Sequence, residues 1–209
     1  MDRARRVGGW LWVVVGLAFQ GVAWWRASVL PGPVTLVLCG VVVLLAAATS
    51  SRSGWAVWLA GWAAAVLLGL DFAGVVADRL GALGPPGAVG VSWGGWRPFV
   101  DDTARLLPGA GEGLVTAAAL AATTAEVALG VLLLSGWQRR WVGKATAGLL
   151  LVYLVSMAAA LGPDAVATYA LPLQVGGALL VSSAPARRPP AATKASLFPT
   201  SRASASEAS

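Results

Sequence analysis

Long apolar stretches, separated by short polar ones, run through most of this chain. Six of them approach the roughly 20 residues that a helix needs to cross a bilayer. They are residues 7–25, 34–49, 55–77, 113–137, 141–161 and 165–183, and the second is the shortest. Because lipid offers the backbone no hydrogen-bond partner, each stretch should be helical. The pattern therefore predicts an all-α integral membrane protein with six transmembrane helices.

The longest polar connection, residues 78–112, carries a different pattern. Between residues 96 and 107, apolar side chains recur at helical spacing while charged ones occupy the other side. Pro98 suits the first turn of a helix, and Pro108 would end it. We predict a short interfacial helix here, between the third and fourth transmembrane helices, that caps the bundle; a gate or a docking platform is the alternative.

Composition supports the membrane assignment, and the distribution of charge predicts the orientation of the protein in the membrane. Hydrophobic residues make up 57% of the chain and charged residues 11%, which excludes an ordinary soluble domain. The basic residues that would mark the cytoplasmic side are Arg3, Arg5, Arg6, Arg52, Arg139, Arg140, Lys144, Arg187 and Arg188. Positive charge favours the cytoplasmic side, so we predict a multi-pass protein of the plasma membrane with both termini cytoplasmic. These small clusters at helix ends do not indicate nucleic-acid binding.

Three regions follow from this pattern. Residues 1–54 form a predicted N-terminal transmembrane hairpin, and residues 55–183 form a four-helix membrane domain. Residues 184–209 are rich in Ala, Pro and Ser, which is typical of a disordered tail, here cytoplasmic.

The residue types that are missing narrow the chemistry. The chain has no His and a single Cys, Cys39. His-ligated haem or metal, His-based catalysis, intrachain disulfides and iron-sulfur clusters are therefore excluded. Neither a GxxxxGK[ST] nor a GxGxxG phosphate loop is present. We expect no catalytic residues, no metal site and no cofactor bound covalently or through His or Cys, so any redox centre must belong to a partner.

Glu126 is an acid in the middle of an apolar stretch. It lies about 16 Å from the end of its predicted helix, and the corresponding distances are about 18 Å for Tyr153 and about 15 Å for Gln174. Asp71 lies about 24 Å along its own helix, nearer the outer surface. Acids at such depth are candidates for function. We therefore predict a ligand pocket formed by Glu126, Tyr153, Gln174 and Asp71.

Structural roles for the same residues remain open. The Glu126 carboxyl could instead hold helices together through a hydrogen bond with Tyr153, Gln174 or a backbone carbonyl. Asp71 could be solvated at the outer interface and pair there with a cation such as Arg79.

Residues 65–183 resemble the DoxX family of small four-helix membrane proteins. The resemblance rests on GLDFAGVVADRLGALGPPG, WGGWRPFVDDTARLLP, TTAEVALGVLLLSGWQRR and AGLLLVYLVSMAAALG, in this order. Glu126, Gly130, Gly136 and Arg139 or Arg140 occupy the positions of the family's recurring acid, glycines and basic turn. Gly162 is followed by PDAVATYALPLQ, where relatives with this loop often have Lys and an Asp-Tyr-Ser stretch. The first two helices lie outside the family's common core.

The resemblance implies a link to redox systems, since some relatives are subunits of thiosulfate:quinone oxidoreductase. Our first hypothesis is a noncatalytic membrane subunit or anchor of a quinone-linked system, which sits in the lipid bilayer and meets a membrane or peripheral oxidoreductase partner. Quinone carbonyls could meet Glu126 or Tyr153. The alternatives are a small-solute or proton permeation protein and a purely structural membrane scaffold.

Overall fold

The computed structural model describes residues 3–27, 33–51 and 53–185. This part of the chain is all-helical and contains no strand. The helices are α1 (Arg3–Ala27), α2 (Pro33–Ser50), α3 (Gly54–Arg79), α4 (Trp96–Leu106), α5 (Glu112–Ser135), α6 (Arg139–Ala160), α7 (Pro163–Thr168) and α8 (Leu171–Ser183). Most of the predicted tail, together with Arg52, Arg187 and Arg188, lies outside the described residues.

Four helices are long and apolar enough to cross a membrane. They are Val7–Arg26 within α1, and α3, α5 and α6 over their whole lengths. The all-α membrane class is therefore confirmed. Cys39–Thr49 of α2 and α8 form shorter apolar helices, so a count of six spanning helices stays a prediction.

The sixth apolar stretch does not form the single helix that we predicted over residues 165–183. It is broken into α7 and α8 at Tyr169 and Ala170, and Ala170 has a left-handed backbone (φ 50°). Pro172 lies in the first turn of α8, where a missing N–H costs nothing, whereas it could not continue a helix from α7. The prediction of one continuous helix is wrong because this proline starts a new one.

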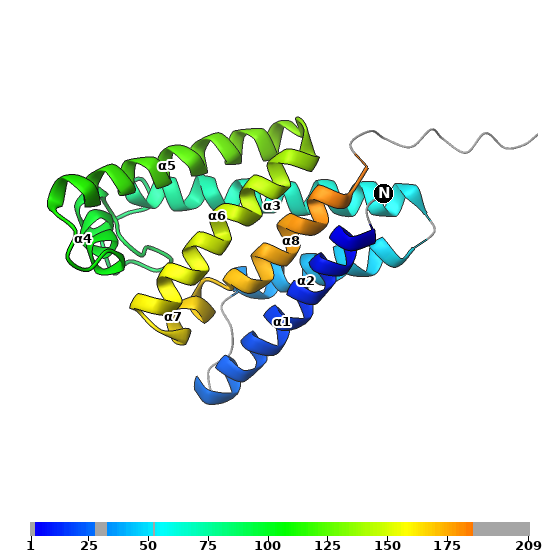
Figure 1. The fold of residues 1–209 in the computed structure, drawn as a ribbon, viewed down its shortest axis with the longest axis horizontal. Helices are drawn as coiled ribbons and strands as arrows, with labels where there is room; N and C mark the ends of the chain where they lie inside the picture. The colour runs from blue at the N-terminus through cyan, green and yellow to red at the C-terminus, as the bar shows by residue number, and fades with distance from the viewer. Residues whose placement is uncertain (1–2, 28–32, 52, 186–209) are drawn as a thin grey trace, which may run out of the picture.

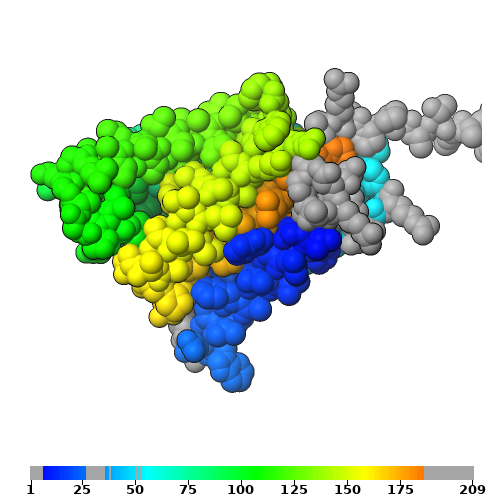
Figure 2. Space-filling model, viewed as in Figure 1, coloured from blue at the N-terminus to red at the C-terminus, as the bar shows by residue number. Residues whose placement is uncertain are grey.

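After the break, α8 runs through the middle of the protein. It packs mainly against α1 and α6, and also against α2 and α3 (Figure 1). All of its residues except Leu179 are buried. In the space-filling view only part of α8 reaches the surface, between α6 and α1 (Figure 2). The N-terminal hairpin is therefore packed onto the last helix and not a separate unit in space.

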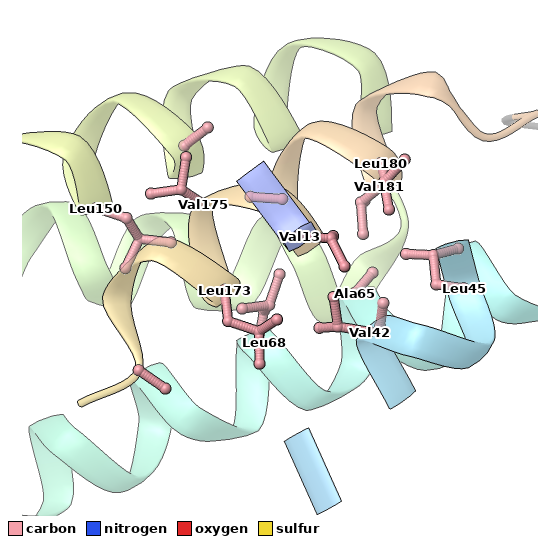
Figure 3. Packing of buried hydrophobic residues seen from close by; sticks show 14 of the residues in the cluster. Val13, Val42, Leu45, Ala65, Leu68, Leu150, Leu173, Val175, Leu180 and Val181 are labelled. Carbon is pink, nitrogen blue, oxygen red and sulfur yellow. The ribbon is translucent and has the colours of Figure 1, made fainter. Parts of the chain in front are cut away.

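Small residues allow this close packing. A Cβ added to Gly143 of α6 would lie 2.7 Å from the Ala178 carbonyl oxygen of α8, and one added to Gly16 of α1 would lie 2.7 Å from the Leu173 backbone. The helices therefore approach to a distance that a side chain would prevent. Leucines and valines of α1, α2, α3, α6 and α8 fill the core between them (Figure 3).

The connection between α3 and α5 contains α4, a helix in the region where the sequence predicts one. Phe99 and Thr103 of α4 are buried, and the helix packs against α5, α6 and α3. It lies at the opposite end of α5 from the α5–α6 turn (Figure 1). The location of α4 at a membrane interface stays a prediction.

Candidate functional site

Glu126 has a charged partner inside the protein. The Glu126 carboxylate is 1% exposed, and Arg79 of α3 is 3% exposed. Arg79 Nη2 donates to Glu126 Oε1 at 2.9 Å, and Arg79 Nη1 lies 2.5 Å from Glu126 Oε2. One contact is a charge-assisted hydrogen bond, which is stronger than a neutral one, and the other is a close ion-pair contact. The charge of the buried acid is therefore balanced by a cation that the sequence suggested for the outer surface.

Tyr153 and Thr123 extend this ion pair into a network across three helices. The Tyr153 hydroxyl of α6 donates to Glu126 Oε1 at 2.6 Å. Arg79 Nη1 also donates to Thr123 Oγ1 at 3.0 Å, one turn before Glu126 on α5. Helices α3, α5 and α6 are thus joined at one point, and the expected proximity of Glu126 and Tyr153 is present.

Aromatic rings from α4 and the loop before it cover the Arg79 guanidinium. Its central carbon lies 3.8 Å from the centroid of the Phe99 ring and 5.2 Å from that of Trp93. The indole Nε1 of Trp93 donates to Asp102 of α4 at 2.9 Å. Such stacking favours a cation that has been removed from water. Helix α4 is therefore positioned directly over the ion pair.

Asp78 holds the loop that carries Trp93. Its carboxylate accepts hydrogen bonds from the backbone N–H groups of Ser92, Trp93 and Gly94 at 2.8 to 3.4 Å. Gly94 has a positive φ of 63°, and a Cβ there would lie 2.4 Å from the Pro86 nitrogen, so the turn requires glycine. Neighbouring residues Asp78 and Arg79 thus have separate tasks: one fixes the loop and the other holds Glu126.

Asp71 and Gln174 form a second polar group. Gln174 Nε2 donates to Asp71 Oδ2 at 3.3 Å and to the Tyr169 carbonyl at 3.0 Å. The second bond satisfies a carbonyl at the break between α7 and α8. The four residues chosen from sequence are therefore arranged as two pairs, Glu126 with Tyr153 and Asp71 with Gln174.

Both pairs line one cavity of about 340 Å³. Helices α3 to α8 all contribute to its wall, and Arg79, Asp102 and Thr103 add polar groups. The remaining wall is mostly apolar or aromatic, including Phe72, Val75, Phe99, Leu150, Met157 and Leu171. An apolar pocket of a few hundred Å³ with few polar groups is typical of a small-molecule site.

Arg79, Trp93 and Phe99 are not among the site residues predicted from the sequence, which suggests Arg79 only as a surface partner for Asp71. A cation in the last turn of an apolar helix is typical of the membrane interface. Distance along α3 alone therefore predicts that Arg79 lies at the surface, because it does not take into account what covers the end of the helix. In the structure, α4 and the loop before it fold over the end of α3, so its last turn is inside the protein. The signal that could have identified Arg79 is the need of a buried acid for a cation.

Among the described residues, no group of three or more His, Cys, Asp or Glu side chains could hold a metal ion. The Asp71, Asp102 and Glu126 carboxylates around the cavity have hydrogen-bond donors as partners.

Residues 99–183 match the model of the DoxX-like family, which confirms the resemblance for this part of the chain. The matched segment includes Glu126, Tyr153 and Gln174, whereas Asp71 and Arg79 precede it. No curated protein and no solved structure matches the chain.

Proposed function

We propose that this DoxX-like membrane protein binds a small apolar ligand with oxygen substituents, of the quinone class, in the cavity beneath α4. The observation that carries the proposal is a mostly apolar pocket that contains a buried, hydrogen-bonded ion pair. In this proposal the protein is a noncatalytic membrane subunit or anchor of a quinone-linked redox system, and an oxidoreductase partner supplies the redox centre.

The polar groups suit both redox forms of such a ligand. Arg79 lines the cavity, and its Nε is a buried donor with no hydrogen-bond partner among the described residues. A quinone carbonyl would accept from this group, and satisfying a buried donor is favourable. Asp71 and the side-chain oxygen of Gln174 would accept a hydrogen bond from the hydroxyl of a reduced quinol.

The same proposal includes the orientation predicted from sequence. The exposed Trp137 and Trp141 lie at the α5–α6 turn, and Lys144 stacks on Trp141 at 4.5 Å. Aromatic and basic residues together are typical of a cytoplasmic membrane interface. With six spanning helices and cytoplasmic termini in the plasma membrane, α4 would be an interfacial helix on the outer side.

Permeation of a proton or small solute past Asp71, Glu126 and Gln174 is less well supported. The cavity wall includes Leu150 and Leu171, which belong to the close-packed core. A path across the membrane would have to open that core. Flux through proteoliposomes that is abolished by Asp71→Asn, in a variant that still folds, would favour permeation over binding.

The direct test is quinone binding to the purified protein. A short-tailed quinone is titrated into wild type, Arg79→Lys and Arg97→Lys, with binding measured by calorimetry. Lysine keeps the charge but lacks Nε, so Arg79→Lys should weaken binding about tenfold, the equivalent of one hydrogen bond. Arg97 is the matched control because its side chain is 79% exposed and paired with Asp101 on the surface of α4.

No saturable binding to wild type would overturn the binding proposal and support a scaffold. Equal affinities for the two variants would overturn the role of Arg79 as a donor to the quinone. The partner is tested separately by affinity purification of the full chain in mild detergent. If no oxidoreductase accompanies the chain and no quinone can be extracted from it, the redox assignment fails.

A further inference from the structure

A second hollow lies beside the candidate site, along the C-terminal half of α3. Its volume is about 370 Å³, and its lining includes Leu67, Leu70, Gly74, Leu83 and Gly90. Leu70 and Leu83 are 55% and 50% exposed, and a Cβ added to Gly74 would meet nothing within 4 Å. We call this hollow the α3 groove. Since α3 is a membrane-spanning candidate, the part of the groove along this helix would face lipid.

The α3 groove and the cavity are adjacent. Asp71, Val75, Trp93 and Tyr169 line both of them, so a single layer of side chains separates the two spaces. Asp71 and Tyr169 are each partly exposed. Tyr169 also lies at the break between α7 and α8, so it belongs to neither helix. The wall between cavity and groove is therefore thin and includes the end of a short helix.

The two spaces differ in the chemistry they offer. The cavity contains the Arg79–Glu126 pair, Tyr153 and Gln174, whereas the groove adds mostly leucine and glycine to the shared wall. Groove residues extend from Leu67 to Asp78 of α3, about 16 Å along the helix. A polar head in the cavity and an apolar tail in the groove would each meet matching surroundings.

We infer that the ligand of the cavity is a lipid with a long apolar tail, and that its tail leaves the cavity past Asp71 and Tyr169 into the α3 groove. This inference rests on the proposed function and adds the class and the pose of the ligand. A cavity of about 340 Å³ holds a ring headgroup but not a long polyisoprenoid or acyl chain as well. The tail must therefore exit, and the groove is the adjacent apolar space that opens to lipid.

The test separates tail binding from headgroup binding. Wild type, Gly74→Leu and Gly148→Leu are reconstituted in phosphatidylcholine nanodiscs and titrated with a tail-free quinone and with a long-tailed quinone of the same headgroup. Gly148 is the matched control: it is exposed on α6, has nothing within 4 Å of an added Cβ, and lines neither space. Quenching of tryptophan fluorescence reports binding. Leu83→Trp is a second groove variant, which narrows the groove from the side of the loop after α3.

We expect Gly74→Leu and Leu83→Trp to weaken binding of the long-tailed quinone about tenfold and to leave the tail-free affinity within about twofold of wild type. Gly148→Leu should change neither affinity. The inference is overturned if both groove variants bind the long-tailed quinone as wild type does, or if they lose the tail-free quinone equally. If wild type binds the tail-free quinone, the proposed function stands whatever the groove variants do. If wild type binds neither quinone, both the proposed function and the tail inference are overturned.

Discussion

Removing the charge of Glu126 while keeping its shape should strongly destabilise the protein. In Glu126→Gln, the Arg79 guanidinium keeps its position under Phe99 but loses the carboxylate that balances its charge. Arginine cannot release its proton to escape this situation. The variant therefore contains an uncompensated buried cation.

The magnitude follows from the burial of the pair. Both side chains are at most 3% exposed, so solvent does not screen the lost interaction. Breaking a buried ion pair by removing one partner costs about 3–5 kcal/mol. For a chain of this size, each kcal/mol corresponds to about 2–4 °C in midpoint temperature, so we expect a decrease of about 6–20 °C.

Cys39 gives a built-in assay for this change. It is the single cysteine of the chain and is 8% exposed, on α2. A thiol-reactive fluorescent dye should label it only after unfolding, so heating the detergent-solubilised protein with the dye reports the midpoint. Glu112→Gln is the matched control, because Glu112 is exposed at the start of the same helix, and its midpoint should shift by about 2 °C or less.

Two results would refute the reasoning. One is a Glu126→Gln midpoint as close to wild type as that of Glu112→Gln. The other comes from the double variant Arg79→Met with Glu126→Leu, which removes both charges together. Replacing a buried pair by apolar residues is often neutral, so the double variant should lose less stability than the sum of Arg79→Met and Glu126→Leu. Simple additivity would mean that the two charges do not interact.

The same dye assay checks three further predictions. Gly143→Ala should destabilise the protein by about 1–3 kcal/mol, because the new Cβ would lie 2.7 Å from the Ala178 carbonyl oxygen. The control Gly148→Ala, on the same helix, should stabilise the protein by about 0.5–1 kcal/mol. Midpoint shifts of the same sign in the two variants would contradict this prediction. Asp78→Asn should lower the stability by about 1–3 kcal/mol, because the Asn side chain accepts the three backbone N–H groups less strongly than the carboxylate does. Hydrogen exchange in residues 91–95 should also become faster. Unchanged exchange would show that this carboxylate does not hold the loop. Phe99→Leu keeps an apolar side chain but loses the stacking on the guanidinium, so about 0.5–2 kcal/mol should be lost, and no loss would contradict a role for the ring.

Hydropathy predicted the long helices well because lipid imposes a simple rule on them. Helices α3, α5 and α6 correspond to the predicted stretches, and their ends lie within a few residues of the predicted ones. The rule failed for residues 165–183, where Pro172 starts a new helix after a break. Hydropathy counts apolar residues, and it cannot distinguish a helix that faces lipid from one, such as α8, that is enclosed by protein.

The site was predicted in part for a related reason. Depth along each helix correctly placed Glu126 near Tyr153, because both distances were counted along straight helices from one end. The same count placed Arg79 at the surface, since sequence spacing does not reveal that α4 folds over the end of α3. Long-range packing, and not helix formation, decided which cation meets the acid.

The N-terminal hairpin has a place in this arrangement that neither hydropathy nor the family match indicates. The Gln20 side chain of α1 is 1% exposed, and its Nε2 donates to the Ala167 carbonyl of α7 at 2.8 Å. A helix break inside a membrane leaves carbonyls without helical partners, and each must be satisfied by protein. Gln174 satisfies the Tyr169 carbonyl, and Gln20 adds a second hydrogen bond to the Ala167 carbonyl, which also accepts from the Ala170 N–H. Helix α1 therefore stabilises the same break that supplies Tyr169 to the cavity wall, so the hairpin supports the geometry of the site from behind.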